Sequence, residues 1–391
     1  MTESPSGAGK AVVKPVQRRI WRIAQQIVAP IVSRKYNGSF EQIGIDGPFL
    51  LVCNHACNAD PIFVGLLSRE KPLTYVASEH LERLGFVTTL LTRSFSIIPR
   101  KKASTAVDTV RSVLRALKQG ASVVLFAEGE CTWDGVSNEV FPATGKLAKI
   151  SRVPLVTCRL EGNYLTKPRW AKASRRGSIN GRVVRRYTPE ELAKMSPEEI
   201  TAAINCDIYE NAWETQRRAN APFISGASAE GLERALFICP ECGKMGSLRT
   251  NKNAIFCTKC NMRVTLDGSS FFQNGRFPTV REWDIWQQGE LQRRMGTGEE
   301  NAELFPAKGK MVDLSGGTKK RVPFHLDLRR GAIVIDGKAI PLSDFTDMAM
   351  VKTNRLLFEW NGSYYEIVTK NGILRPYLLA KQFYSTEKGG E

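Results

Sequence analysis

The chain has 391 residues, 42% of them hydrophobic and 24% charged, and a formal net charge of +17. This is ordinary globular composition, and the length allows two or three domains. No run approaches the ~18 apolar residues of a spanning helix, and the N-terminus lacks the apolar core of a secretory signal. We therefore expect a cytoplasmic or peripheral protein with an anionic partner: nucleic acid, anionic lipid or a phosphorylated substrate.

The N-terminal region is predicted to be a polar, disordered lead over residues 1–15, followed by an amphipathic helix over 16–32. Isoleucines and valines recur there at helical spacing, while Arg18, Arg19 and Arg22 lie on other faces. The pattern predicts a helix that breaks or ends near Pro30. Such a helix either packs on its own domain or lies in a membrane interface, with Trp21 at the boundary.

From residue 48 onward, short apolar runs alternate with helical patterns. Residues 48–53, 122–127 and 153–158 have the length of buried strands, and 104–119 has the spacing of an amphipathic helix. This alternation predicts an α/β fold with a largely parallel sheet in a domain that ends near residue 222. A polar segment follows each of the three strands, so we expect these segments to converge beyond the carboxyl ends of the strands.

The first polar segment, NHACNAD at 54–60, places His55 five positions before Asp60. One regular helix would rotate them apart by ~140°, so they meet only if the chain turns between them. Because Asp60 precedes Pro61, we predict that it caps a helix, and it is also a candidate partner that orients His55 as a general base. A third interpretation makes Cys57 a nucleophile with His55 as its base, which a turn disfavours.

Residues 167–186 contain eight basic residues and no acid. Such a run is either a solvated loop or a surface for anionic head groups or a phosphorylated carrier, and we favour the second interpretation.

Two CxxC pairs, CPEC and CTKC, predict a zinc ribbon over residues 232–270. Nine cysteines, an odd number, without a secretion signal argue against a disulfide framework. Four thiolates close a tetrahedral shell, so the predicted Zn²⁺ is structural, with an iron centre or a nucleic-acid-binding ribbon as alternatives. The ribbon lacks a dense basic and aromatic surface, so we do not expect nucleic acid as a partner. The predicted ligands are Cys239, Cys242, Cys257 and Cys260.

Residues 271–391 are predicted to form a β-rich module. Asp-Gly at 336–337 and Asn-Gly at 361–362 are hairpin turn signals between strand patterns. A final apolar stretch predicts a closing helix, and the whole faintly resembles a pleckstrin-homology or GRAM-like barrel. His325 falls in a strand pattern and is predicted to be a packed residue.

Four segments within residues 16–220 resemble the conserved blocks of the glycerolipid acyltransferase family, the 1-acylglycerol-3-phosphate acyltransferases. NHACNAD has the NHx4D pattern, and residues 85–100, 126–132 and 153–162 resemble the second, third and fourth blocks. The resemblance implies a mixed sheet flanked by helices. It also implies transfer of a fatty acyl group from acyl-CoA or acyl carrier protein to the hydroxyl of a lysophospholipid or related glycerolipid, at the cytoplasmic face of a membrane.

The resemblance also implies roles for individual residues. His55 is the base that activates the hydroxyl and Asp60 is its partner, so no acyl-enzyme is expected. The expected substrate-binding residues are Asn54, Arg100, Glu128, Gly129 and Lys146.

The third block departs from the family pattern at Cys131, where the family has an arginine. A cysteine cannot form the bidentate, charge-assisted bonds with which arginine holds a phosphate. Either another basic residue supplies the missing charge, or the acceptor is less anionic. The candidate residues for supplying this charge are Arg93, Arg100, Lys101, Lys102 and Lys146. The alternative function is an inactive acyltransferase-like protein that binds lipid or nucleic acid.

Overall fold

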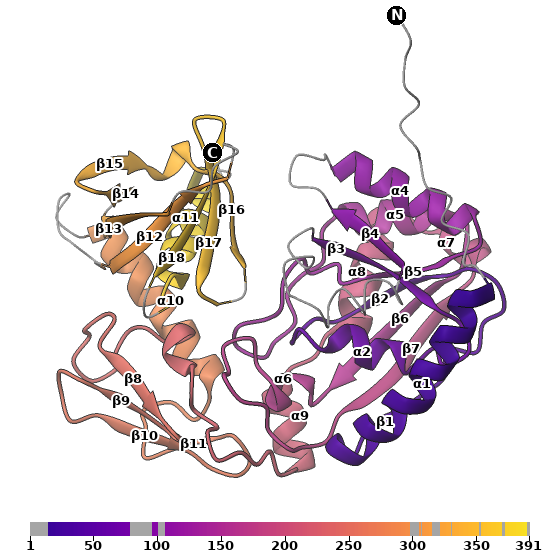
Figure 1. Cartoon of the computed structure of the whole chain (residues 1–391), viewed down its shortest axis with the longest axis horizontal. Coiled ribbons are helices and arrows are strands. Elements are labelled where there is room, and N and C mark those ends of the chain that lie inside the picture. The colour runs from indigo at the N-terminus through magenta and orange to yellow at the C-terminus, as the bar shows by residue number, and fades with distance from the viewer. Residues whose placement is uncertain are drawn as a thin grey trace, which may run out of the picture. The chain divides into compact units, whose positions relative to one another are not determined.

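The computed structural model describes residues 15–78, 96–100, 106–297, 305, 307–314, 321–329, 331–351, 353–369 and 372–388 (Figure 1). The chain divides into two compact units, Met1–Thr166 with Arg176–Ala219, and Lys167–Arg175 with Asn220–Glu391. Residues 1–14 of the predicted disordered lead, and 85–95 of the second family-like block, lie outside the described residues. No helix among the described residues is long and apolar enough to cross a membrane.

The first unit is built on a seven-stranded sheet. Its strands are β1 (Ser39–Phe40), β2 (Leu50–Cys53), β3 (Leu73–Ser78), β4 (Ser96–Arg100), β5 (Ser122–Leu125), β6 (Leu155–Glu161) and β7 (Asn180–Tyr187), in the order β1-β7-β6-β2-β5-β3-β4. Every neighbouring pair is parallel except β6 and β7. Leu50, Leu51 and Val52 are fully buried, as expected for a parallel strand covered on both faces. The predicted α/β fold with a largely parallel sheet is confirmed.

Helices cover both faces of this sheet. Leu51 and Cys53 share one apolar cluster with α1 and α2, whereas Leu50 and Val52 share another with α4, α5 and α8, because successive strand residues point to opposite faces. The helices are α1 (Pro15–Tyr36), α2 (Asp60–Gly65), α4 (Ala106–Lys118), α5 (Ala143–Ser151), α6 (Asn163–Thr166), α7 (Pro189–Lys194), α8 (Pro197–Ile208) and α9 (Ala212–Ala219).

Helix α1 differs from its prediction in two ways. It continues through Pro30 to Tyr36, because Ala29 and Val32 remain buried and their packing outweighs the one backbone bond that proline removes. Trp21 does not lie at a membrane boundary: it is 1% exposed, and its indole Nε1 donates to the Ser68 carbonyl at 2.8 Å.

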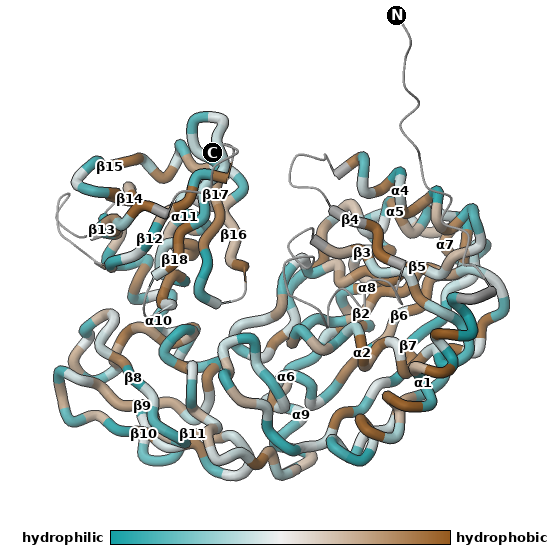
Figure 2. Tube along the Cα trace, viewed as in Figure 1, coloured by the Kyte–Doolittle hydropathy of each residue, from teal (hydrophilic) through white to brown (hydrophobic). Residues whose placement is uncertain are grey.

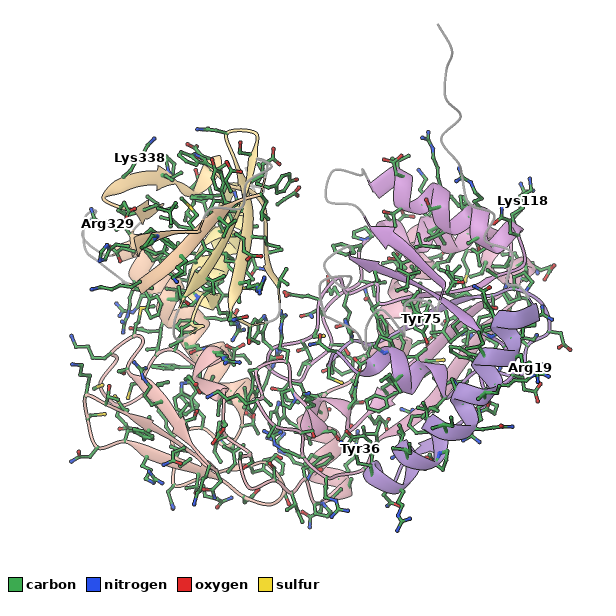
Figure 3. All side chains as sticks on the ribbon, viewed as in Figure 1. Arg19, Tyr36, Tyr75, Lys118, Arg329 and Lys338 are labelled. Atoms are coloured by element: carbon green, nitrogen blue, oxygen red, sulfur yellow. The ribbon has the colours of Figure 1, made fainter. Side chains whose placement is uncertain are left out.

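The apolar residues of α1 that sequence periodicity grouped together face solvent rather than the sheet. Ile20, Ile23, Ile27 and Ile31 are between 39% and 59% exposed. Brown segments along α1 in Figure 2 mark its apolar residues, and the labelled Arg19 in Figure 3 projects away from the helix. The helix thus has a buried face and a separate exposed stripe of four isoleucines, here called the isoleucine stripe.

The basic run at 167–186 is divided between the units. Residues 167–175 belong to the second unit, where Arg175 is buried, donates to the Ser228 carbonyl at 2.6 Å and lies 5.1 Å from the Trp170 ring centroid. In the first unit, Arg182 pairs with Glu161 and Arg186 with Glu41. Arg175 is therefore not available to a head group, whereas Arg182 and Arg186 pair with acids and remain partly exposed, so the role of the run as a surface for anionic head groups stays a prediction.

The second unit contains two antiparallel sheets. Strands β8 (Leu248–Asn251), β9 (Ala254–Cys257), β10 (Arg263–Leu266) and β11 (Phe272–Gln273) form the first, after the short helix η2 (Leu232–Arg234). Helix α10 (Val280–Thr297) follows. The second sheet has the order β15-β14-β13-β12-β18-β17-β16, and α11 (Arg375–Lys388) closes the chain. Its elements are β12 (Ala307–Asp313), β13 (Arg321–Arg329), β14 (Ala332–Ile335), β15 (Lys338–Pro341), η3 (Leu342–Asp344), β16 (Thr346–Val351), β17 (Arg355–Trp360) and β18 (Ser363–Thr369).

Both predicted hairpin turns are present in the second sheet. Asp336, Gly337, Asn361 and Gly362 all have positive φ, as a two-residue type I′ turn requires. The prediction for His325 was wrong, because its side chain is 73% exposed.

A buried ion pair joins α11 to α10 in this unit. Arg375 binds both carboxylate oxygens of Asp284, at 2.5 and 2.7 Å, and also donates to the Ala235 carbonyl. We expect Arg375→Met to lower the free energy of unfolding of the second unit by about 3–5 kcal/mol, because Asp284 is left as an uncompensated buried charge. Urea unfolding measures this. The double variant with Asp284→Leu should recover much of the loss, and a single variant as stable as wild type would contradict the prediction.

Candidate functional site

The candidate site lies beyond the carboxyl ends of three adjacent strands. β6, β2 and β5 are neighbours and run parallel, so their following segments meet at one edge of the sheet. The segment after β2 carries His55 and Asp60, the segment after β5 carries Glu128 and Cys131, and α6 begins with Asn163 after β6. The expected convergence of the three polar segments is confirmed.

Asp60 organises the segment after β2. It is fully buried, and its Oδ2 accepts hydrogen bonds from the amides of Ala56 and Cys57 and lies 2.9 Å from His55 Nδ1. Its Oδ1 accepts from Asn163 Nδ2 at 2.9 Å. The predicted N-cap was wrong: α2 begins at Asp60 itself, Ala59 takes the N-cap position, and the carboxylate turns back to the preceding loop. This backward turn is what brings the carboxylate to the imidazole.

His55 is held through both ring nitrogens. Its Nδ1 faces the Asp60 carboxylate, so Nδ1 carries the donated proton and Nε2 is the nitrogen available as a base. Nε2 lies 3.3 Å from the Cys131 Sγ, and the Phe126 ring stacks on the imidazole at 4.3 Å. The side chain is 17% exposed. Burial alone would lower the pKa of His55, but the adjacent Cys131 and Asp60 outweigh it and raise the pKa to about 10.

Two of the predicted substrate-binding residues form hydrogen bonds with the backbone around the site. Asn54 exchanges two hydrogen bonds with the backbone of Leu160 in β6. The Glu128 carboxylate accepts from the amides of His55 and Asn138, both at 2.6 Å, and burial raises the pKa of Glu128 to about 7 despite these bonds. Both side chains thus position the His55 loop.

Gly129 is required by its backbone. Its φ is +83°, and a Cβ there would lie 2.6 Å from the Phe141 ring. An alanine at this position would combine backbone strain with a clash.

The remaining candidate cations are placed only in part. Arg100 is the last residue of β4, which pairs with β3, and Lys146 is exposed on α5. Arg93, Lys101 and Lys102 lie outside the described residues.

The sequence did not predict the contacts that two residues of the site make. Asn163 was visible only as part of a polar segment after β6, and its bond to Asp60 spans 103 positions. Cys131 was noticed for replacing an arginine, but its contact with His55 spans 76 positions. Cys57, the cysteine next to His55 in sequence, instead points to Asp60 Oδ1 at 3.1 Å.

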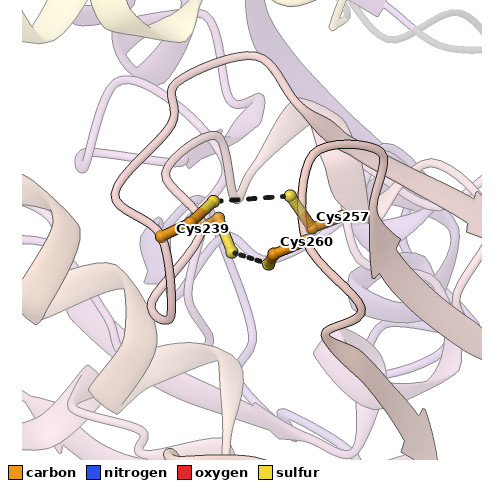
Figure 4. A group of neighbouring side chains, drawn as sticks. Cys239, Cys257 and Cys260 are labelled. Atoms are coloured by element: carbon orange, nitrogen blue, oxygen red, sulfur yellow. Dashed lines mark hydrogen bonds between the residues drawn. The ribbon is translucent and has the colours of Figure 1, made fainter.

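Four cysteines gather in the second unit, as the sequence predicted. Their Sγ atoms all lie within 4.8 Å of one another, with Cys239 and Cys260 3.6 Å apart and Cys242 and Cys257 3.7 Å apart (Figure 4). The Lys259 amide donates to the Cys257 Sγ, an arrangement that stabilises a thiolate. None of the nine cysteines, all of which the structure describes, forms a disulfide. This cluster has the donor set to hold a metal ion.

A buried aspartate and the histidine that it orients thus lie beyond the carboxyl ends of parallel strands in an α/β domain. Residues 32–161 of the chain match the family model described as Acyltransferase.

Two of the individual proteins similar to this chain are acyltransferases by their descriptions. A probable 1-acyl-sn-glycerol-3-phosphate acyltransferase of Mycoplasma genitalium is 27% identical over 120 residues, which are 30% of this chain and 45% of that protein. The chain thus spans less than half the length of this relative. The crystal structure of the 1-acyl-sn-glycerophosphate acyltransferase PlsC from Thermotoga maritima is 18% identical, covers 49% of this chain and 77% of its own, and has a TM-score of 0.40.

Proposed function

We propose that the protein transfers a fatty acyl group from a thioester, acyl-CoA or acyl carrier protein, to the hydroxyl of a lysophospholipid or related glycerolipid. The observation that carries this proposal is the His55–Asp60 pair, in which Nδ1 is bound to a buried carboxylate and Nε2 points away from it. Asp60 fixes the tautomer and stabilises the imidazolium that forms when Nε2 takes the hydroxyl proton. The match to the acyltransferase family supports the acyl chemistry.

A panel of acceptors tests this function. Purified protein is incubated with radiolabelled acyl-CoA or acyl carrier protein and a series of lysophospholipids, lysophosphatidic acid among them, and lipid products are separated. We expect acylated product with wild type and with His325→Ala, an exposed histidine in the second unit, but not with His55→Ala. Equal acyl release by wild type and His55→Ala would contradict the assignment. Salt-dependent nucleic-acid binding without acyl transfer would favour the alternative function.

We also propose that the isoleucine stripe of α1 holds the protein on the lipid surface where its acceptor resides. Four large apolar side chains in one exposed stripe are unusual for a surface helix. Arg18, Arg19 and Arg22 are exposed on the same helix and can meet anionic head groups. The stripe supplies the apolar contact and the arginines supply the charge.

Vesicle binding tests the role of the stripe. Burying one isoleucine in lipid contributes about 1.5–3 kcal/mol, so Ile27→Glu with Ile31→Glu should weaken sedimentation with phosphatidylcholine–phosphatidylglycerol vesicles by more than about tenfold. Ile224→Glu is the matched control, because Ile224 is equally exposed (61%) but lies outside α1. Unchanged binding by the double variant, or equal loss in the control, would exclude the stripe as the lipid contact.

The cysteine cluster is proposed to hold a structural Zn²⁺. A tetrahedral site with zinc–sulfur bonds of about 2.3 Å places its sulfurs about 3.8 Å apart, close to the 3.6 and 3.7 Å separations within the cluster. Four thiolates fill the shell, so the role assigned to the ion is to stabilise the fold. The seven antiparallel strands and closing helix after the ribbon support the proposed pleckstrin-homology-like module.

A further inference from the structure

The Cys131 sulfur lies beside the ring nitrogen of His55 that would accept a proton from a substrate. His55 has two ring nitrogens, and Nδ1 is taken by Asp60. The other, Nε2, lies 3.3 Å from the Cys131 Sγ. A general base must lie within hydrogen-bond reach of the proton it removes, and the Cys131 thiol lies within that reach of Nε2.

The three residues form the arrangement of a nucleophilic triad. The nucleophile contacts one nitrogen of the imidazole, and a buried carboxylate orients the other nitrogen. Each member comes from a different structural element: Cys131 from the segment after β5, His55 from the loop after β2, and Asp60 from the start of α2.

We propose that Cys131 is a catalytic nucleophile that receives the acyl group from the thioester donor and passes it to the hydroxyl acceptor. The inference rests on the proposed acyl-transfer function. It replaces direct transfer in one step by transfer in two steps through an acyl-cysteine. It gives the departure at position 131 a chemical role, because an arginine there cannot form an acyl intermediate and a cysteine can.

The two steps balance without a further reactant. In the first, the Cys131 thiol gives its proton to His55 Nε2, the sulfur attacks the thioester carbonyl, and the carbon–sulfur bond to the donor breaks. The donor thiolate leaves with the proton from His55. In the second, the acceptor hydroxyl gives its proton to Nε2 and its oxygen attacks the acyl-cysteine. The bond to Cys131 breaks, an ester forms, and the Cys131 sulfur recovers the proton.

Neighbouring cysteines are not placed for this chemistry. Cys57 points to Asp60 Oδ1, and burial raises the pKa of its thiol well above the ordinary value. Cys53 lies fully buried in β2, and burial likewise raises the pKa of its thiol. Among the three, only Cys131 contacts the base.

Three measurements on the wild-type protein test the intermediate without any variant. Intact-mass spectrometry after incubation with palmitoyl-CoA, or with palmitoyl carrier protein, should show one added acyl group, which neutral hydroxylamine removes. Labelled coenzyme A should also exchange into palmitoyl-CoA without an acceptor, because a thioester intermediate makes the first step reversible. Peptide mapping should place the acyl group on Cys131.

Cys131→Ser and Cys131→Ala should lose the hydroxylamine-sensitive adduct. In both variants the rate of coenzyme A exchange should fall by at least about 100-fold, because removing the nucleophile of a triad reduces the rate by more than this. Cys206→Ser is the matched control: Cys206 is exposed on α8, and this variant should keep both signals.

The outcomes separate this inference from the proposed function. If the wild-type protein transfers acyl groups without adduct and without exchange, or if Cys131→Ala keeps full transfer, Cys131 is not the nucleophile. The proposed acyltransferase function is then unaffected. Adduct and exchange without transfer to any lysolipid support the nucleophile and overturn the proposed acceptor class. Absence of adduct, exchange and transfer overturns both.

Discussion

His55→Ala is expected to reduce the rate of acyl transfer by about 10²–10⁴-fold, the usual contribution of a positioned general base. No other described histidine can replace it, because the remaining one, His325, is exposed in the second unit. The backbone bonds of His55 to Glu128 and Thr132 do not involve the imidazole, so the loop should keep its conformation in the variant. Initial rates at saturating donor measure the effect, and unchanged thermal unfolding serves as the control for folding.

Asp60→Asn gives a further test of the pair through pH. The Asp60 carboxylate raises the pKa of His55, so its removal should lower that pKa and move the acidic limb of the rate profile to lower pH. The maximal rate should fall, because the amide can present the wrong hydrogen-bonding group to Nδ1. A profile of kcat/KM against pH that does not move would show that Asp60 is not coupled to the base.

Loss of zinc is expected to unfold the ribbon of the second unit. Apparent binding energies for structural zinc are about 10–16 kcal/mol near neutral pH, and strands as short as β8 to β10 cannot replace that contribution. We expect one zinc ion per chain by elemental analysis. A strong chelator, or Cys257→Ser, should remove the ion together with a cooperative unfolding transition.

The matched control for this prediction is again Cys206→Ser, which changes an exposed cysteine outside the cluster and should retain one zinc per chain. Iron with the visible absorbance of a thiolate-bound centre would support the alternative metal. Stoichiometric zinc in Cys257→Ser with unchanged unfolding would contradict the four-cysteine site.

Features encoded in short stretches of chain could be predicted from the sequence. The buried strand cores at 50–53 and 122–125 appeared as apolar runs, and both hairpin turns appeared as Asp-Gly and Asn-Gly pairs. The two CxxC pairs predicted the cysteine cluster, because each pair is local and four thiols near one another have few other uses. The His55–Asp60 pair was also predicted, although the reason that it forms was not.

The remaining features depended on which surfaces and loops pack together. Periodicity identified an apolar side of α1, yet packing buried Trp21 and left the isoleucines exposed, because either side of such a helix can face the core. Asp60 was expected to cap α2, but two amides of the preceding loop and Asn163 hold its carboxylate instead.

The sequence by itself therefore determined the α/β class, the family-like blocks, the four-cysteine cluster and the candidate base. Only the tertiary structure placed Cys131 at the second nitrogen of His55 and Asn163 on Asp60. Spacing along the chain carries no information about contacts across 76 or 103 positions. Such contacts form because parallel neighbouring strands bring their carboxyl ends, and the loops that follow them, to one edge of the sheet.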